Sequence, residues 1–120
     1  MRKTVKTGRG TGKTIETMMM MKERKNLYTI VPGYMVKYDL FRDICTDLGF
    51  SKDITDDIMK RIVDCKRAED IFREDIDAKF HVEEADRLLE DFIGVPFDTM
   101  TTSHWHVETF RRNEYEKEGL

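Results

Sequence analysis

The sequence has few of the residues that would assign it to several common protein classes. It contains two cysteines and two prolines in 120 residues. Cys45 and Cys65 lack the C-x-x-C spacing of a metal or redox motif, so we expect both to be buried free thiols in a reducing cytoplasm. No apolar run approaches the roughly 20 residues of a membrane helix, and no signal-peptide core follows the basic N-terminus. The sequence therefore predicts a cytoplasmic protein with no membrane partner.

Neither sign of charge dominates. The chain has 21 basic and 24 acidic residues and a net charge of −3, so no overall attraction to nucleic acid is expected. Charged residues make up 38% and hydrophobic residues 39%, which is typical of a folded globular protein rather than a disordered one. Residues 1–120 are expected to form a single domain. A local basic patch stays open, because five basic residues gather near the N-terminus: Arg2, Lys3, Lys6, Arg9 and Lys13.

The most informative motif is the glycine-rich stretch Thr7–Thr14. The phosphate-binding loop pattern is a glycine, four residues and then Gly-Lys-Ser/Thr. Gly12, Lys13 and Thr14 fill its last three positions, while the first glycine stands one place late, at Gly8. Such a loop turns backbone N–H groups toward an anion, and the helix that follows points its positive end at the same anion. A flexible glycine-rich turn is the alternative interpretation.

This stretch resembles the Walker A loop of P-loop NTPases, and it looks most like small phage-type ATPases and the motor domain of terminase large subunits. The resemblance implies ATP and Mg²⁺ as cofactors and a possible link to DNA in a host cytoplasm. Lys13 would neutralise the β- and γ-phosphates, and the Thr14 hydroxyl would ligate Mg²⁺. The residues that would contact the nucleotide are Gly8, Arg9, Gly10, Thr11, Gly12, Lys13 and Thr14.

An acidic segment much further along the chain provides a second motif. The run from Phe80 to Asp86 is similar to the Walker B run of helicases and terminases, in which a strand ends in Asp-Glu-Ala-Asp; here the first acid is Glu83. The resemblance implies that Glu83 holds Mg²⁺ and that Glu84, with Lys13, is catalytic, since a second carboxylate orients the attacking water. The alternative is an ordinary helix start, because acidic residues favour the first turn.

Predicted strands and helices alternate along the chain, which is typical of an α/β protein with a parallel sheet. The clearest strand covers 27–31, and the helix after it shows apolar residues at spacings of four and three from Tyr34 to Leu48, with Gly49 as its C-cap. The four methionines 18–21 are interpreted as core packing rather than a partner groove. The other strands are expected at 2–6, 61–65, 78–82 and 97–102, and the other helices at 13–25, 53–59, 66–74, 85–93 and 105–117.

We therefore expect a three-layer, P-loop-like α/β domain with a mostly parallel sheet of about five strands. Ligands of such sheets bind at the carboxyl ends of the strands. By position along the chain, one of Thr101, Thr102 and Ser103 would sense the γ-phosphate. Arg111 and Arg112 could supply an arginine finger, although paired basic residues late in a helix are commonly surface charge. His104 and His106 would share a face only on a strand, which makes a metal site there a remote alternative.

Three functions stay open at this point. The first is ATP binding with Mg²⁺-dependent hydrolysis, in which the oligomeric state is undetermined. The second is a non-catalytic adaptor that binds a nucleotide or nucleic acid and retains the P-loop shape, favoured by Glu83 and by the displaced Gly8. The third is a small protein-interaction module without a nucleotide, favoured by the charge-rich composition.

Overall fold

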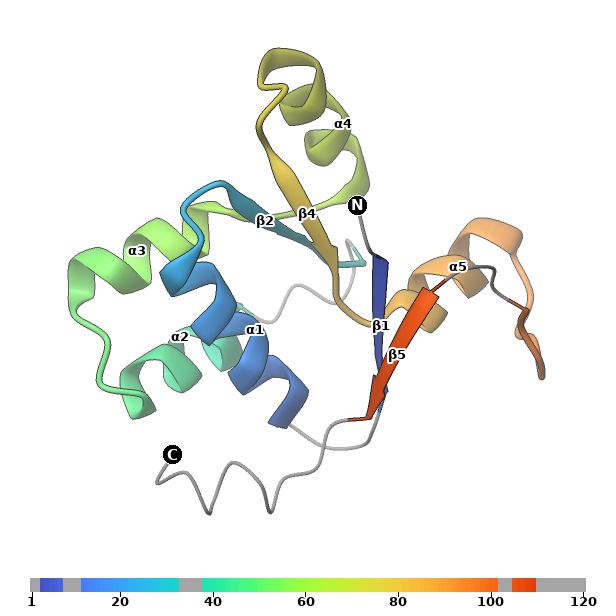
Figure 1. Ribbon diagram of the computed structural model, residues 1–120, viewed down its shortest axis with the longest axis horizontal. Helices are drawn as coiled ribbons and strands as arrows, with labels where there is room; N and C mark the ends of the chain where they lie inside the picture. The colour runs from blue at the N-terminus through green and yellow to red at the C-terminus, as the bar shows by residue number, and fades with distance from the viewer. Residues whose placement is uncertain (1–2, 8–11, 33–37, 102–104, 110–120) are drawn as a thin grey trace.

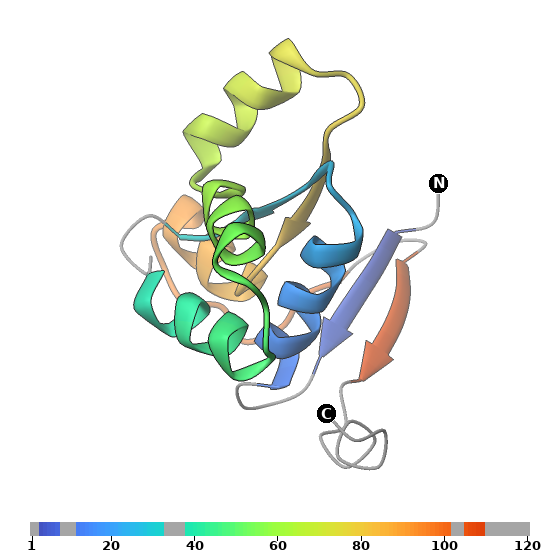
Figure 2. The ribbon, with the colours of Figure 1, turned by 90° about the vertical axis from the view of Figure 1, so that its left-hand side faces the viewer.

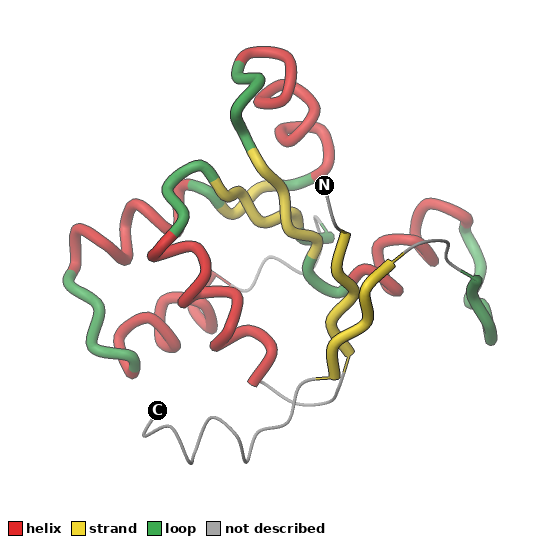
Figure 3. Tube along the Cα trace, in the orientation of Figure 1, coloured by secondary structure: helices red, strands yellow, loops and turns green. Residues whose placement is uncertain are grey.

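The computed structural model describes residues 3–7, 12–32, 38–101 and 105–109, with side chains described in 13–32 and 39–101. Strands and helices alternate along this part of the chain (Figure 3). The described strands are β1 (Lys3–Thr7), β2 (Leu27–Ile30), β3 (Ile62–Val63), β4 (Lys79–Val82) and β5 (Trp105–Thr109). The described helices are α1 (Gly12–Glu23), α2 (Tyr38–Asp47), α3 (Lys52–Lys60), α4 (Cys65–Glu74) and α5 (Ala85–Ile93).

Every strand pair among these residues is parallel, but the strands form two sheets (Figure 1). A three-stranded sheet has the order β3-β2-β4, and β1 pairs with β5 in a separate two-stranded sheet. The expected α/β class and parallel pairing are confirmed. The expected single sheet of about five strands is wrong for the described residues, because β1 forms its five-residue ladder with β5 and no ladder joins it to β4.

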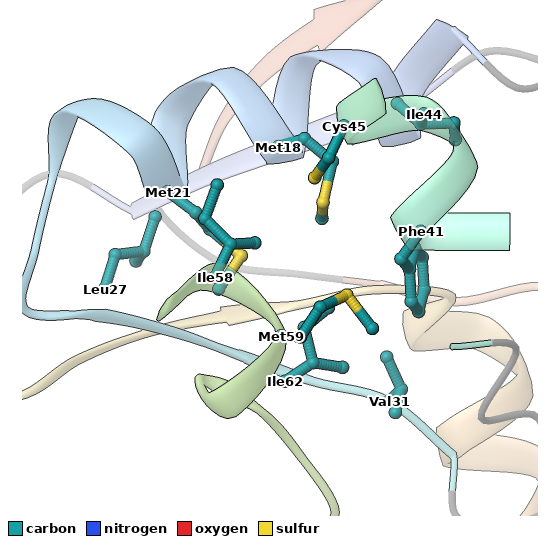
Figure 4. Close-up of a cluster of buried hydrophobic side chains, with 10 residues drawn as sticks. All are labelled: Met18, Met21, Leu27, Val31, Phe41, Ile44, Cys45, Ile58, Met59 and Ile62. Atoms are coloured by element: carbon teal, nitrogen blue, oxygen red, sulfur yellow. The ribbon is translucent and has the colours of Figure 1, made fainter. Parts of the chain in front are cut away.

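Helices cover both faces of the three-stranded sheet. Successive residues of a strand point to opposite faces. On one face of β2, Leu27 belongs to the larger of two hydrophobic clusters, the main core. On the other face, Tyr28 and Ile30 pack against a smaller cluster beneath α4, which is made of Val63, Ala68, Ile71 and Ala78. The main core lies between the sheet and α1, α2 and α3 (Figure 4), and its members are Met18, Met21, Leu27, Val31, Phe41, Ile44, Cys45, Ile58, Met59 and Ile62. Two of the four consecutive methionines are thus fully buried, which confirms core packing for Met18 and Met21.

Local capping explains where several helices begin and end. Ser51 accepts a hydrogen bond from the Ile54 N–H at the start of α3 (3.2 Å), and Asp64 accepts one from the Arg67 N–H at the start of α4 (2.8 Å). These side chains satisfy N–H groups that have no partner within the helix. The predicted C-cap glycine is confirmed, because Gly49 follows α2 with φ 78°. Gly94 follows α5 in the same way with φ 89°, a conformation that glycine adopts at little cost.

The end of the chain differs from the sequence prediction. Residues 97–101 contain no strand, and the helix expected from 105 is a strand, β5, in register with β1 from Lys3↔Trp105 to Thr7↔Thr109. A partner strand distant in sequence supplies backbone hydrogen bonds that a local pattern cannot reveal. The remainder of the expected helix, 110–117, and the first residues of the helix expected from Tyr34 lie outside the described residues.

The expectations for membrane helices and for the two cysteines have different outcomes. No helix in the described ranges is long and apolar enough to cross a membrane. Cys45 is free and buried as expected, and burial raises the pKa of its thiol. Cys65 is also free but exposed, so the expectation that both thiols are buried is wrong; Cys65 begins α4, outside both apolar clusters.

A buried cation ties the end of α1 to the sheet. Arg61 is 5% exposed and follows α3. Its guanidinium donates to the carbonyls of Met21 (2.8 Å), Arg24 (3.0 Å) and Leu27 (2.8 Å), and to the Asp57 carboxylate (2.9 Å). The last carbonyls of a helix have no intrahelical partner and carry partial negative charge. Arg61 therefore stabilises the connection from α1 to β2 with the charge that this end of the helix favours.

We expect Arg61→Met to lower the free energy of unfolding by about 2 to 4 kcal/mol, since several buried carbonyls lose their donors. Arg42→Met is the matched control, because Arg42 is half exposed in its 3.0 Å ion pair with Asp56 and such pairs contribute at most about 1 kcal/mol. Urea unfolding of both variants measures the difference. Equal losses in the two variants would contradict the structural role of Arg61.

Candidate functional site

The candidate site lies where the first turn of α1 meets the end of β4. The Thr14 hydroxyl donates a hydrogen bond to Oε1 of Glu83 over 3.2 Å, joining residues 69 positions apart in the sequence. Lys13 precedes Thr14 in the same helical turn, and Glu84 follows Glu83. The structure therefore brings the described part of the glycine-rich motif to the acidic motif. Gly8, Arg9, Gly10 and Thr11 lie outside the described residues.

The other oxygen of Glu83 is also held by the protein. Oε2 lies 2.9 Å from Thr17 Oγ1, which donates to it, and 2.9 Å from Nε2 of His81. The same His81 nitrogen lies 3.2 Å from Thr17 Oγ1. Glu83 is only 7% exposed. Because a buried carboxylate is costly unless it is hydrogen-bonded, these contacts explain how the charge is accommodated.

The geometry of the two elements places these four side chains. Thr14 and Thr17 are three residues apart on α1 and so share a helix face. His81 is paired with the buried Thr29 of β2, so it points to the face of the sheet that α1 covers. Glu83 is two residues further on and shares this face, and its backbone N–H continues the ladder by donating to Ile30 O (2.9 Å).

The environment of Glu83 favours its ionised form. Burial raises the pKa of this carboxyl, but hydrogen bonding and charge from His81, with hydrogen bonds from Thr17 and Thr14, outweigh burial. The net pKa of Glu83 is held below its ordinary value. At neutral pH Glu83 is therefore a fixed negative charge beside the N-terminal turn of α1.

Glu84 has a contrasting setting. It is exposed and adopts the left-handed conformation, with φ 54° and ψ 48°, at the start of α5. It is the one described non-glycine residue with positive φ, a conformation that is uncommon and costs free energy for such a residue. Its carboxylate lies 3.9 Å from Nε of Arg87. The two neighbouring glutamates thus differ: Glu83 is buried and held, and Glu84 is open to solvent.

Sequence reasoning missed two members of this cluster, Thr17 and His81. Both carried a signal: Thr17 is one helical turn beyond Thr14, and His81 precedes Glu83 by two on a strand, the spacing that shares a face. His81 contacts α1 through Thr17.

Most of the weaker candidates lie outside the residues whose side chains the structure describes. Thr101 is exposed and belongs to no strand. It therefore does not end the strand after β4, because that strand, β5, begins at Trp105 and ends at Thr109. Thr102, Ser103, His104, Arg111 and Arg112 lie outside the described residues, and His106 belongs to β5.

The donor set suits a hard cation better than a soft one. Thr14 and Glu83 offer a hydroxyl and a carboxylate oxygen, the ligand types that Mg²⁺ prefers. In the part of the chain that the structure describes, no group of three or more His, Cys, Asp and Glu side chains could hold a metal by itself. Mg²⁺ commonly binds through one or two protein groups plus phosphate oxygens and water, so this observation is compatible with a metal that arrives with a nucleotide.

Comparison of the chain with protein-family models, with curated proteins and with solved structures finds no match. Function is therefore inferred from the site itself.

The lowered pKa of Glu83 gives a test of the cluster. A carboxyl whose pKa is lower in the folded state stabilises the fold above its ordinary pKa of 4.5 and loses that contribution as the pH falls through the folded-state value. Below pH 4.5 the wild type should therefore lose more stability than Glu83→Gln. Urea unfolding at a series of pH values measures this difference.

Glu69→Gln is the control for this experiment, because Glu69 is exposed on α4 and its carboxylate pairs with the exposed Arg73. Its effect on the free energy of unfolding should stay within about 1 kcal/mol. A wild type that loses no more stability in acid than Glu83→Gln would show that the carboxylate is not held as described.

Proposed function

We propose that this chain binds a nucleoside triphosphate, with ATP as the expected one, together with Mg²⁺, and that it hydrolyses the nucleotide through a minimal P-loop-like site. The observation that carries the proposal is the contact between Thr14 and Glu83 (3.2 Å). It joins the Gly-Lys-Thr end of the glycine-rich motif to the first acid of the acidic motif. The resemblance of both motifs to Walker A and Walker B runs implies that these two residues hold one metal ion.

In this proposal the phosphates lie at the N-terminal end of α1. A helix N-terminus favours anions through its unpaired N–H groups and its dipole. The backbone of Gly8–Gly12 would surround the phosphates, and the Lys13 ammonium would neutralise them. Support comes from Gly12 and Lys13 being the first residues of α1, the position from which such groups reach an anion.

The residues at the junction also fit the metal. Adjacent ligands of octahedral Mg²⁺, at 2.0–2.1 Å each, lie about 2.9 Å apart. Thr14 Oγ1 and Glu83 Oε1 are 3.2 Å apart, so one ion could replace the hydrogen bond between them with a small adjustment. Oε2 stays with Thr17 and His81, which orient the carboxylate. Bound Mg²⁺ would neutralise charge on the phosphate oxygens.

Glu84 is the residue proposed to act on water. Its carboxylate would orient a water whose oxygen bonds to the γ-phosphorus as the bond to the bridging oxygen breaks, giving ADP and phosphate; the proton released passes through Glu84 to solvent. Support comes from its exposed side chain directly after Glu83 and from its left-handed backbone, since strained residues gather at functional sites.

A second candidate function is nucleotide binding without hydrolysis, in an adaptor protein that could also bind nucleic acid. It is favoured by Glu83, whose oxygens are both engaged by protein donors. A carboxylate satisfied in this way can serve as a structural link between α1 and β4, and the site would then bind phosphate without assembling a catalytic metal.

Nucleotide binding predicts stabilisation. ATP with Mg²⁺ at about 100 times its Kd should raise the free energy of unfolding by about 2.7 kcal/mol, which thermal unfolding can detect. Lys13→Ala should remove this stabilisation, because it removes the positive charge that would neutralise the phosphates. Lys52→Ala is the charge-matched control, since Lys52 is exposed at the start of α3. If Lys13→Ala and Lys52→Ala respond to ATP as the wild type does, the nucleotide proposal is wrong.

Phosphate release separates the two candidate functions. If the chain is an ATPase, Glu84→Gln should abolish phosphate release and preserve stabilisation by ATP, because only the group that orients water is lost. Glu90→Gln on the same helix is the control and should retain activity. Stabilisation of the wild type by ATP without phosphate release would favour the adaptor.

A further inference from the structure

Helix α5 contributes nothing to the described core. None of its residues is buried, although its sequence carries four large apolar side chains, Leu88, Leu89, Phe92 and Ile93. Phe92 is 90% exposed and Ile93 is 52% exposed, and the apolar surface continues beyond the helix with Val95 at 57%. Scattered single apolar residues on a surface are ordinary, but a contiguous exposed group marks an interaction site.

The apolar residues of α5 form one stripe. At 3.6 residues per turn, positions 88, 89, 92 and 93 fall on one side of a helix. Asp86 and Asp91 then border this stripe on opposite edges, and Glu90 and Arg87 lie further round. The α5 stripe is therefore an apolar ridge, made by Leu88, Leu89, Phe92 and Ile93, with a carboxylate along each side.

The position of α5 leaves the stripe accessible. Figure 1 shows α5 at the side of the molecule away from α2 and α3, and Figure 2, turned by 90°, places it behind those helices. In the described part of the chain, α5 has no neighbouring element with which it shares an extensive contact. Glu84 is the N-cap residue of α5, so a partner on α5 would also lie next to the candidate site.

We infer that the α5 stripe is a docking surface for a partner protein that presents an amphipathic helix with an apolar stripe flanked by Lys or Arg. Apolar side chains of the partner would cover Phe92 and Ile93, and basic side chains would pair with Asp86 and Asp91. A second copy of this chain fits poorly, because pairing two α5 stripes brings like carboxylates together at their edges. An anionic bilayer is disfavoured by the same carboxylates.

The test uses the full chain and designed helical peptides as probes. Two peptides carry the same leucine stripe, one with Lys flanks and one with Glu flanks, and their binding is followed by fluorescence anisotropy. The Lys-flanked peptide should bind at least about tenfold more tightly, with the preference decreasing as salt is added. Phe92→Glu should weaken its binding at least about tenfold, since it places a charge in the apolar contact. Ile76→Glu is the matched control, because Ile76 is 86% exposed and lies in the connection between α4 and β4 rather than in α5.

Charge reversal distinguishes recognition of the flanking charges from non-specific hydrophobic binding. Asp86→Lys together with Asp91→Lys should shift the preference to the Glu-flanked peptide, whereas Asp43→Lys with Asp47→Lys, both exposed on α2, should not. Equal binding of the two peptides, no binding, or unchanged binding of Phe92→Glu would overturn the proposal. So would concentration-dependent dimerisation lost in Phe92→Glu, or binding to phosphatidylcholine vesicles, since each assigns the stripe to another occupant.

Discussion

A carboxylate that loses water on folding must recover its hydrogen bonds from the protein, and Glu83 recovers them at the junction of α1 and β4. Thr14 donates a hydrogen bond to Oε1 of Glu83, and Thr17 and His81 both contact Oε2. Two of these donors come from α1 and one from β4, so their geometry fixes the first turns of the helix against the end of the strand. At the opposite end of α1, Arg61 satisfies the last carbonyls. A buried anion near the helix start and a buried cation at its end both agree with the helix dipole.

This arrangement gives two adjacent acids different chemical capacities. Glu83 is buried and its pKa is held low by His81, Thr17 and Thr14 despite burial, which suits a permanent negative charge. Glu84 faces solvent from a left-handed backbone position, which leaves its carboxylate available to a ligand. Paired carboxylates in contrasting environments are a common basis for divided roles in catalysis. In the proposed nucleotide site, Glu83 helps to hold the metal ion and Glu84 orients the attacking water.

Sequence reasoning succeeded where a local pattern and the tertiary environment agree. Strand β2 was evident from its β-branched and aromatic residues, and α5 was bounded by its acidic start and Gly94. It failed at β5, because Trp105–Thr109 forms a strand through pairing with β1 at the other end of the chain. Thr14 and Glu83 could be named from motifs, whereas Thr17 and His81 required knowing that α1 covers that face of β4. Local sequence patterns do not predict which helix covers which face of the sheet.

The central physical claim is that Glu83 and the hydroxyls of α1 act as one unit. A double-mutant cycle with Thr17→Val and Glu83→Gln tests it most directly, because their side chains are 2.9 Å apart and residues in one hydrogen-bond network are energetically coupled. The free energies of unfolding of the wild type, both single variants and the double variant give the coupling. We predict a coupling of at least about 1 kcal/mol at pH 7. Additive effects, within about 0.5 kcal/mol, would contradict the claim.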